Sequence, residues 1–287
     1  METLGSSSTQ QICIQCGNEY DAKHITVLER DQDLSGGLCY ECRAEQDKDR
    51  VARQNALLAT EVNDKRAMWR NACGIPDKYR TATLHSFRVD RPGNMKKAKD
   101  VCQEYADGFP LDYLRYKKER GAYRSLILFS TDVWGIGKTH LVCAIMHRIL
   151  DRWNGERTGC PVLFISEPEL YRRIQATYNY TQEEKKYRES EEEIMNGLLY
   201  TPLLVLDDVG KEQRTDARFV QRTLFAIING RYNNLRPIVL TSNMSAKQLE
   251  LYLGNSGEQA SFDRLFEMTG SPKNGFLKMT GESYRRR

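Results

Sequence analysis

Gly135-Ile136-Gly137-Lys138-Thr139 follows an apolar run, Leu126-Ile127-Leu128-Phe129, that is typical of a buried strand. Further along the chain a second apolar run, Leu203-Leu204-Val205-Leu206, ends in two carboxylates, Asp207 and Asp208. A glycine-rich turn before a lysine, and a second strand that ends in acidic residues, are the two halves of a nucleoside-triphosphate site. Together they predict a P-loop nucleoside-triphosphatase.

The glycines of the first stretch suit a phosphate cradle. Gly135 and Gly137 let backbone N–H groups approach phosphate oxygens without a Cβ in the way. A helix that begins near Lys138 offers its free N–H groups and its positive dipole end to the β-phosphate, and the lysine reaches the β- and γ-phosphates. The predicted nucleotide-binding residues are Gly135, Ile136, Gly137, Lys138, Thr139, His140 and Asp207.

Three oxygen-bearing side chains complete the predicted chemistry. The Thr139 hydroxyl is expected to ligate Mg²⁺, and Asp207 is expected to hold the same ion through water. Asp208 is predicted to polarise the attacking water as a general base. The predicted cofactors are therefore ATP and Mg²⁺, and the predicted reaction is ATP hydrolysis.

One position departs from the usual P-loop pattern. The motif begins with Gly, and this chain has Asp132 there. Asp adopts a left-handed backbone more readily than most residues, so the loop shape can be retained. Its carboxylate repels a triphosphate unless it points away, which predicts weaker nucleotide binding. For the glycines alone, an ordinary strand-to-helix turn is the alternative, and the paired carboxylates argue against it.

The length of 287 residues suits one α/β domain with an appendage. Hydrophobic residues make up 40% of the chain, which is enough for a sizeable core, and the net charge of +4 does not by itself indicate a nucleic-acid-binding protein. No apolar run is long enough to cross a membrane, and Met1–Gln11 lacks the apolar centre of a signal peptide. We therefore expect a soluble, cytoplasmic protein without a membrane partner.

Four of the eight cysteines form two close pairs, Cys13-x-x-Cys16 and Cys39-x-x-Cys42. Each pair can close a knuckle around one tetrahedral Zn²⁺, with His24 as an alternative ligand in the spacer. Disulfides, redox-active pairs and an iron–sulfur cluster are the competing interpretations, and cytoplasmic character favours zinc. Four protein ligands leave no open position, so the zinc is expected to be structural.

The zinc module is predicted to span residues 1–45, with a β-hairpin through residues 25–28. It is too small to bury much core, so the metal would hold it folded, and we interpret it as a docking module for protein or nucleic acid. Residues 46–73 are rich in charged residues and predict a helical linker to an ATPase domain at 74–287. The remaining cysteines, expected to be reduced structural thiols, are Cys73, Cys102, Cys143 and Cys160.

Strands and helices alternate along the predicted ATPase domain. Helices are predicted at 96–119, 138–152, 167–177, 182–199, 215–233, 245–253 and 258–268. Strands are predicted at 126–129, 162–165, 203–206, 238–240 and 275–279. This alternation predicts an α/β fold with a mainly parallel sheet and helices on both faces.

The motifs as a set resemble those of AAA+ ATPases, specifically bacterial helicase loaders of the DnaC/DnaI type and their transposition-helper relatives of the IstB type. The P-loop, Leu203–Gly210, Thr241-Ser242-Asn243 and Phe262-Asp263-Arg264-Leu265 occur in the order of that family. The lead-in Gly74–Arg80 and the terminal Gly281-Glu282-Ser283-Tyr284-Arg285 are also similar. The resemblance covers roughly residues 72–287.

The resemblance implies catalytic roles for Asn243 and Arg264. Asn243 would be the sensor-1 amide that holds the attacking water, and the same segment can also form a turn that Ser245 caps. Arg264 would be an arginine finger that donates hydrogen bonds to a neighbour's γ-phosphate. From the residues alone, an ion pair with Asp263 or Glu267 is an equal alternative. A finger implies that the working form self-associates through the ATPase domain.

Asp208 stands where many AAA+ proteins carry glutamate, and the shorter side chain predicts slow hydrolysis, stimulated by DNA or a partner. The chain beyond Arg264 has room for a strand and a tail, so a helical lid domain is expected to be reduced or absent.

The segment 167–200 is long for a connection between two strands. Aromatic and cationic residues alternate there, which suits stacking on bases and pairing with phosphates of single-stranded DNA. A solvated helix pair is the alternative, because the acidic run 189–193 offsets part of the charge. The residues concerned are Tyr171, Arg172, Arg173, Tyr178, Tyr180, Lys185, Lys186, Tyr187 and Arg188.

The leading hypothesis is an ATP-regulated loader that binds a hexameric replicative helicase and single-stranded DNA during replication initiation. A DNA-transposition helper and a zinc adaptor that binds nucleotide weakly are the alternatives. The amino-terminal zinc module favours the loader over the transposition helper.

Overall fold

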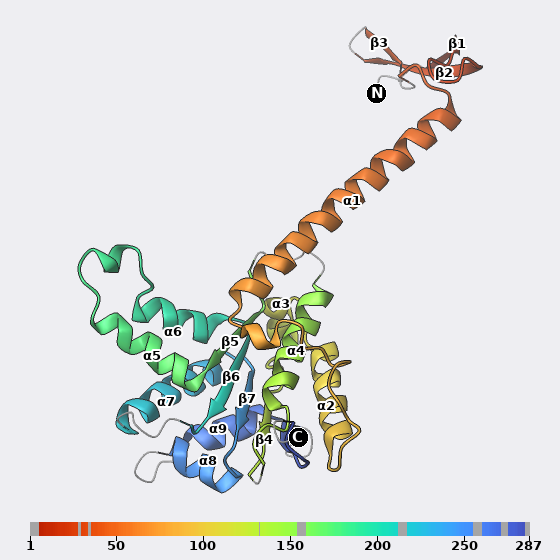
Figure 1. Ribbon diagram of the computed structural model, residues 1–287. Helices are drawn as coiled ribbons and strands as arrows, with labels where there is room; N and C mark the ends of the chain where they lie inside the picture. The colour runs from red at the N-terminus through yellow and green to blue at the C-terminus, as the bar shows by residue number, and fades with distance from the viewer. Residues whose placement is uncertain are drawn as a thin grey trace. The chain divides into compact units, whose positions relative to one another are not determined.

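The computed structural model in Figure 1 describes residues 6–27, 30–33, 36–131, 133–153, 159–211, 217–254, 260–270 and 275–284. For residues 6–7, 24–27 and 30–33 it defines the backbone alone. The chain forms two compact units, Met1–Asp64 and Lys65–Arg287. The described residues do not include Asp132 or residues 285–287, and the side chain of His24 is not described either.

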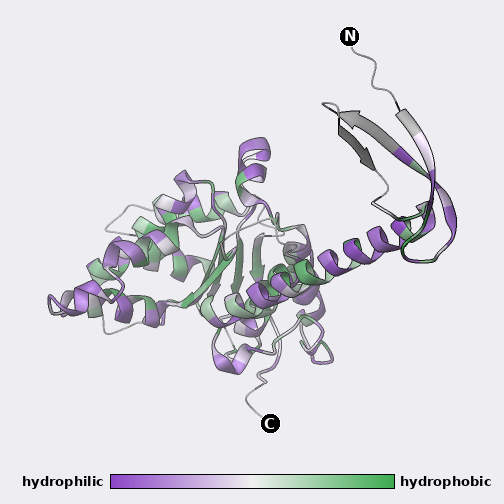
Figure 2. Ribbon diagram, turned by 90° about the horizontal axis from the view of Figure 1, so that it is seen from above, coloured by the Kyte–Doolittle hydropathy of each residue, from purple (hydrophilic) through white to green (hydrophobic). Residues whose placement is uncertain are grey.

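The boundary between the units lies inside one long helix, α1 (Tyr40–Ala72). Residues 45–61 of this helix are all exposed, and Figure 2 shows most of it as hydrophilic. Its middle is rich in Ala, Glu, Lys, Arg and Gln, which have high intrinsic helix propensity. This is the helix predicted for residues 46–73, and it begins six residues earlier than expected.

The amino-terminal unit holds a small antiparallel sheet in the order β1-β2-β3. Its strands are β1 (Ser6–Ile12), β2 (Glu19–Val27) and β3 (Arg30–Asp33). The hairpin predicted through residues 25–28 corresponds to the β2–β3 connection. β1 lies in a polar Ser/Thr/Gln stretch for which the sequence predicts no element, and it forms by pairing with β2 in the register Ser6↔Ile25 to Ile12↔Glu19.

The second unit is built on a five-stranded parallel sheet in the order β5-β6-β7-β4-β8. The predicted α/β fold class is confirmed. The strands are β4 (Leu126–Phe129), β5 (Val162–Ser166), β6 (Leu203–Val209), β7 (Ile238–Ser242) and β8 (Phe276–Lys278). β4, β6 and β7 are almost completely buried, as continuous apolar strands between two helical layers must be.

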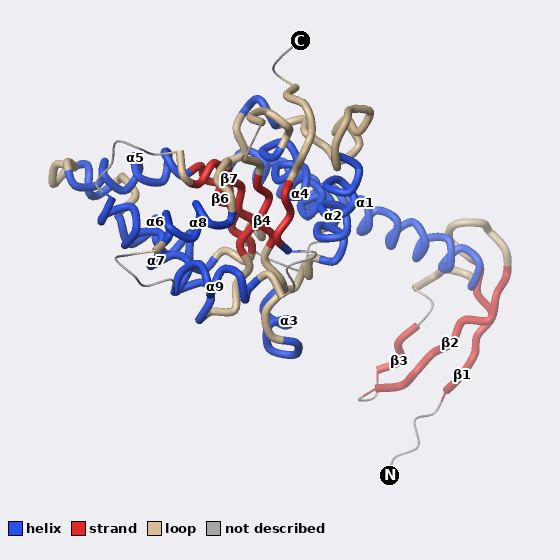
Figure 3. Tube along the Cα trace, turned by 90° about the horizontal axis from the view of Figure 1, so that it is seen from below, coloured by secondary structure: helices blue, strands red, loops and turns tan. Residues whose placement is uncertain are grey.

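Helices cover both faces of this sheet, and Figure 3 shows the two layers on either side of the strands. One layer contains α2 (Met95–Gly108) and α4 (Lys138–Arg152). The other contains α5 (Glu167–Tyr178), α6 (Glu191–Tyr200), α7 (Ala217–Asn233), α8 (Ala246–Leu253) and α9 (Ala260–Met268). Beyond α9, the described residues contain β8 and the segment up to Tyr284, and no helical lid. No described helix is both long and apolar enough to cross a membrane.

The helix predicted for residues 96–119 is wrong as a single element. It is divided into α2, which ends at Gly108, and α3 (Tyr113–Arg120). Pro110 has no N–H group, and it keeps the preceding Phe109 in an extended conformation with φ −63° and ψ 125°. α3 then restarts with Asp112 as its N-cap, whose carboxylate accepts a hydrogen bond from the Arg115 N–H group at 3.1 Å.

The helix predicted for residues 182–199 is also wrong in its first half. A short 3₁₀ turn, Glu184–Lys186, precedes α6. α6 begins after Ser190, where Ser190 and Glu193 form a capping box that satisfies two free N–H groups. Glu191, Glu192 and Glu193 of the acidic run therefore occupy the first turn of a helix, where carboxylates complement the dipole.

A buried arginine joins the helices behind the sheet. Arg231 of α7 is 0% exposed, and burial lowers the pKa of its guanidinium to about 9. It donates hydrogen bonds to the carbonyl oxygens of Leu198, Thr201, Pro202 and Pro237. The charge is thus held by backbone dipoles at the end of α6 and the starts of β6 and β7.

Replacing Arg231 with Met should lower the free energy of unfolding by about 3 kcal/mol, because four buried carbonyl groups lose their donor. Denaturant titration of the full chain measures the change. Arg222→Met, at an exposed position of the same helix, is the matched control and should change stability by less than about 0.5 kcal/mol. Equal stabilities of the two variants would contradict the proposed contribution of Arg231.

Candidate nucleotide site and metal centre

The turn between β4 and α4 has the backbone that a phosphate cradle requires. Gly135 and Gly137 have φ values of +78° and +96°, a region in which a Cβ is strained. Gly137 is also the N-cap of α4, and a Cβ there would lie 2.6 Å from the Phe87 ring. Free N–H groups at the start of α4 therefore face the space where a phosphate would bind.

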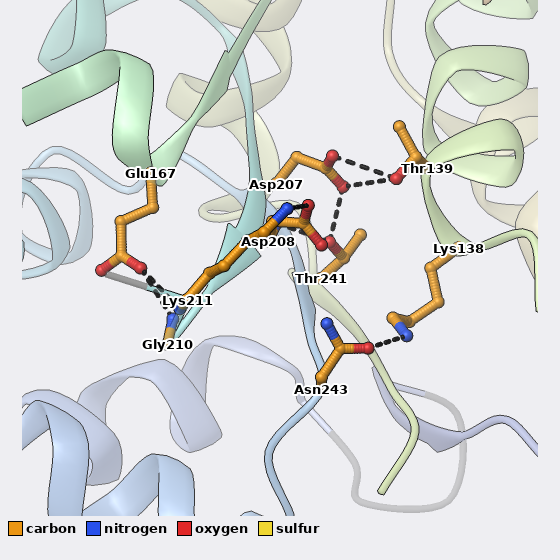
Figure 4. A network of polar contacts seen from close by, with 9 residues as sticks. All are labelled: Lys138, Thr139, Glu167, Asp207, Asp208, Gly210, Lys211, Thr241 and Asn243. Carbon is orange, nitrogen blue, oxygen red and sulfur yellow. Dashed lines mark hydrogen bonds and ion pairs between the residues drawn. The ribbon is translucent and has the colours of Figure 1, made fainter. Parts of the chain in front are cut away.

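Lys138 connects the ends of two central strands. Its side chain is almost completely buried, and Nζ donates a hydrogen bond to Ser130 Oγ at 2.6 Å. Nζ also donates to Asn243 Oδ1 at 2.7 Å, which Figure 4 shows. Ser130 follows β4 and Asn243 follows β7, so the ammonium lies at the carboxyl edge of the sheet. Both acceptors are neutral oxygens, and a phosphate is the stronger partner for an ammonium group.

Thr139 and Asp207 lie together as a magnesium site requires. The Thr139 hydroxyl donates to the Asp207 carboxylate at 3.0 Å, and Thr241 Oγ1 donates to the same carboxylate at 2.5 Å. Asp207 is 4% exposed, and burial raises its carboxyl pKa to about 6. A hydroxyl and a carboxylate within hydrogen-bond distance are ligands that Mg²⁺ accepts, and the ion would favour the ionised carboxylate.

A β-bulge separates the roles of the two adjacent carboxylates. Leu206 pairs with Leu240, but Val209 pairs with Ser242, so β6 has one more residue than β7 between these pairs. Asp208 lies in the bulge with φ +58°, its N–H group donates to Thr241 Oγ1 at 2.9 Å, and its carboxylate pairs with Lys211 Nζ at 3.2 Å. Bulges redirect side chains next to active sites, and here Asp208 lines the cavity while Asp207 is buried behind Thr139.

A cavity of about 670 Å³ lies over the P-loop, within the range of ligand pockets. Its lining contains six of the seven predicted nucleotide-binding residues, together with Asp208 and Asn243. The seventh, Asp207, does not line the cavity but accepts a hydrogen bond from Thr139, which does. His140 faces the segment that precedes α2, with Nε2 3.0 Å from the Thr83 carbonyl oxygen. The exposed indole of Trp134 lies at the same cavity.

The carboxy-terminal segment closes one side of this cavity, which the sequence does not predict. The Tyr284 N–H group donates to the Gly135 carbonyl oxygen at 3.0 Å, and its ring lies 4.5 Å from the Arg91 guanidinium. Tyr284 also donates from its hydroxyl to the Arg88 carbonyl oxygen. Residues 88–91 and Tyr284 therefore meet beside the P-loop.

In the amino-terminal unit the four predicted thiols form one cluster. The Sγ atoms of Cys13, Cys16, Cys39 and Cys42 all lie within 4.8 Å of one another, and those of Cys16 and Cys39 are 3.7 Å apart. A ZnS₄ tetrahedron with bonds of about 2.3 Å has edges of about 3.8 Å. The Cys16–Cys39 separation matches such an edge, and the cluster is compatible with a tetrahedral zinc site.

Backbone hydrogen bonds prepare this cluster for a cation. The Cys39 N–H group donates to Cys13 Sγ at 3.3 Å and lowers the pKa of the Cys13 thiol to about 6. The N–H group of Gly17, which has φ +75°, donates to the Cys13 carbonyl oxygen at 2.9 Å and closes the knuckle. The four other cysteines are free thiols, with Cys73, Cys102 and Cys143 buried.

The family model described as IstB-like ATP binding protein matches residues 123–287, which is more than half of the chain. The chain belongs to the IstB-like ATP-binding family. This match confirms the prediction that the chain belongs to the DnaC/DnaI and IstB-like group of AAA+ proteins.

Curated relatives of this IstB-like protein include two helicase loaders. It is 25% identical over 209 residues to the replicative helicase loader DnaC of Escherichia coli (strain K12), covering 72% of this chain and 74% of that protein. It is 22% identical over 238 residues to the replicative helicase loader DnaI of Bacillus subtilis (strain 168), covering 82% of this chain and 63% of that protein.

Solved structures show the same fold. The crystal structure of the DnaC helicase loader aligns with a TM-score of 0.50 at 21% identity, covering 67% of this chain and 96% of that chain. The crystal structure of DnaI aligns with a TM-score of 0.51 at 20% identity, covering 75% and 95%.

Arg264 does not line the cavity of its own IstB-like domain. Its guanidinium lies 5.6 Å from the Phe225 ring and 5.9 Å from the Tyr232 ring. Within the described part of the chain it forms no ion pair with Asp263 or Glu267, and Glu267 instead accepts a hydrogen bond from the Tyr232 hydroxyl at 2.9 Å. The arginine finger stays a prediction, and the ion-pair alternative is not observed.

The segment 167–200 contains fewer available cations than its sequence suggests. Three of its arginines form ion pairs with nearby carboxylates, namely Arg172 with Glu169, Arg173 with Glu189 and Arg188 with Glu184. Tyr171 is buried in the core and is not available for stacking. The exposed residues that remain without such pairs in the described structure are Tyr178, Lys185, Lys186 and Tyr187.

Three residues of the site were given no role by the sequence analysis, although Thr241 lies in one of the recognised motifs. Ser130 accepts from Lys138, and Glu167 accepts hydrogen bonds from the turn after Asp208. Thr241 donates to the Asp207 carboxylate and accepts from the Asp208 backbone N–H group. Ser130 and Thr241 occupy the ends of β4 and β7, and their place at a strand end was the available signal. Glu167 carries no comparable signal in the sequence.

Replacing Cys16 with Ser should reduce bound zinc from one ion per chain to well below one and unfold the amino-terminal unit, since the metal supplies its folding free energy. Metal analysis and circular dichroism measure both effects. Cys160→Ser, at a half-buried cysteine in the other unit, is the control and should keep the zinc. Visible absorption from iron in the purified protein, or full zinc in Cys16→Ser, would contradict the site.

Proposed function

We propose that this protein is an ATP-hydrolysing loader of a hexameric replicative helicase, and that it engages single-stranded DNA. The observation that carries the ATPase part is the connected set of contacts at the carboxyl edge of the sheet. Lys138 reaches Asn243, and Thr139 reaches Asp207, so the P-loop already contacts the ends of β6 and β7. The loader part rests on the likeness to DnaC and DnaI, both named replicative helicase loaders.

The residues at this edge have complementary roles in the proposed reaction. The N–H groups of the P-loop and the Lys138 ammonium bind and orient the phosphates, and Asn243 and Asp208 face the same space from two strands. Asp208 takes the proton from the attacking water, while Asn243 holds that water in line. Mg²⁺, held by Thr139 and Asp207, would neutralise charge on the β- and γ-phosphates.

The zinc module is proposed to dock on the helicase. The residues around its cysteine cluster include exposed apolar side chains, with Ile12, Ile14 and Tyr40 exposed by 65%, 78% and 85%. Apolar groups with a phenol hydroxyl suit a protein interface better than a phosphate backbone. This favours a protein partner over nucleic acid for the module.

Single-stranded DNA is proposed to bind along the segment 178–187. Lys185 and Lys186 supply charge for phosphates, and the exposed rings of Tyr178 and Tyr187 supply stacking surfaces. A transposition helper and a nucleotide-weak zinc adaptor are the competing functions. The zinc cluster argues against the first, and the P-loop geometry argues against the second.

The wild-type protein should bind ATP and hydrolyse it slowly, with faster turnover in the presence of single-stranded DNA. Lys138→Ala should reduce turnover at least about 100-fold, because the phosphates lose their cation. Lys247→Ala, at an exposed position of α8, is the control for loss of a positive charge. Phosphate release measures turnover, and Trp134 fluorescence measures binding. A wild-type protein that binds no ATP would support the adaptor.

Arg264→Ala should retain ATP binding and lose hydrolysis by about 100-fold or more, since the finger acts on a neighbour's nucleotide. Asp208→Asn should also be inactive, because it lacks the general base. A mixture of the two variants should recover part of the activity, because one kind of mixed interface contains an intact base and an intact finger. Lack of recovery, or equal loss of ATP binding in Arg264→Ala and Lys138→Ala, would contradict a role in trans.

A further inference from the structure

Glu167 is a fully buried carboxylate beside the nucleotide site. It is the first residue of α5, directly after β5, and its side chain is 0% exposed. Burial raises its carboxyl pKa, which reflects the cost of removing a carboxylate from water. Such a group is retained only where hydrogen bonds compensate for that cost.

Each oxygen of this carboxylate accepts two hydrogen bonds. Oε1 accepts from the hydroxyls of Tyr171 and Tyr252, both at 2.8 Å. Oε2 accepts from the backbone N–H groups of Gly210 at 2.7 Å and Lys211 at 3.3 Å. Figure 4 shows the side chain pointing from α5 to the turn that follows β6. Glu167 therefore joins α5 and α8 to the segment that carries Asp208.

That segment has a backbone that needs support. Asp208 has φ +58°, which costs free energy for a residue with a Cβ, and Gly210 follows with φ +91°. A Cβ at Gly210 would lie 2.5 Å from Met244 Sδ, so the turn is also tightly packed. Strained conformations of this kind persist only where several neighbours fix them.

Side chains from two elements, β7 and α5, fix this turn almost residue by residue. The Asp208 N–H group donates to Thr241 Oγ1, and the Val209 carbonyl oxygen accepts from Ser242 Oγ at 2.7 Å. The next two N–H groups, of Gly210 and Lys211, both donate to Glu167. Without Glu167, β7 alone would hold the turn, and the N–H groups of Gly210 and Lys211 would lose their buried acceptor.

We propose that Glu167 is a positioning residue for hydrolysis, which holds the turn 208–211 so that Asp208 points into the nucleotide cavity. The inference rests on the proposed ATPase activity. Lys211 belongs to the same turn and pairs with Asp208, so a displaced turn would move both groups. Because displacements of about 1 Å can cost on the order of 100-fold in rate, Glu167 acts on turnover more than on binding.

Two variants of Glu167 separate its chemistry from its volume. Glu167→Leu fills similar space without an acceptor, so the N–H groups of Gly210 and Lys211 lose their partner. Glu167→Gln retains one carbonyl oxygen that can accept from both. Tyr252→Phe is the matched control, because it removes a hydrogen bond to the other oxygen and leaves the turn side unchanged.

The experiment measures kcat, KM and ATP affinity for the full-length wild type and the three variants, with single-stranded DNA present. Thermal melting reports the folded fraction of each. Glu167→Leu should lower kcat by about 10- to 100-fold with ATP affinity within about 3-fold of the wild type. Glu167→Gln should recover most of the kcat, and Tyr252→Phe should remain near the wild type.

Wild-type kcat in Glu167→Leu would overturn the inference and leave the proposed ATPase standing. So would a parallel loss of folding or ATP affinity, which indicates a purely structural role. A Gln variant as slow as the Leu variant would also overturn it, because the acceptor would then not be the cause. Absence of turnover in the wild type itself would instead overturn the proposed function and this inference together.

Discussion

One hydroxyl group holds the two adjacent aspartates of the site in their different positions, one by its carboxylate and the other by its backbone. Thr241 Oγ1 donates to Asp207 Oδ1 and accepts from the Asp208 N–H group, which is the division of roles that a hydroxyl allows. Asp207 is thereby fixed next to Thr139, and the bulge at Asp208 is fixed next to the cavity. The parallel pairing of β6 with β7 places Thr241 there, so the chemistry depends on the register of the central sheet.

The same edge of the sheet explains why the site is nearly complete within one chain. β4 supplies Ser130 and the P-loop, β6 supplies the carboxylates, and β7 supplies Thr241 and Asn243. Open parallel sheets bind ligands at the carboxyl ends of their strands, where loops and helix N-termini converge. Arg264, for which an arginine-finger role stays a prediction, lies elsewhere and does not line this cavity.

Much of this arrangement could be predicted from the sequence, because its signals are local. The apolar strands, the glycine turn and the capping residue Ser245 each encode structure within a few positions, and the predicted α4 has the bounds observed. The break at Pro110 is also a local signal, which the single helix predicted for residues 96–119 ignores. Strand β1 has no apolar alternation and forms only because β2 offers a partner. The bulge at Asp208 and the contacts of Glu167 depend on residues far apart in the chain, which periodicity cannot reveal.

In the proposed function, ATP bound at this site drives loading of a helicase onto DNA. The most direct test places the purified protein with the replicative helicase of its own genome and closed circular single-stranded DNA, and measures stable helicase on the circle. We predict that loading requires the protein and its zinc module, and that the Lys138→Ala variant binds the helicase but fails to complete the ATP-dependent step. A helicase that neither binds the protein nor gains access to the circle would contradict the account.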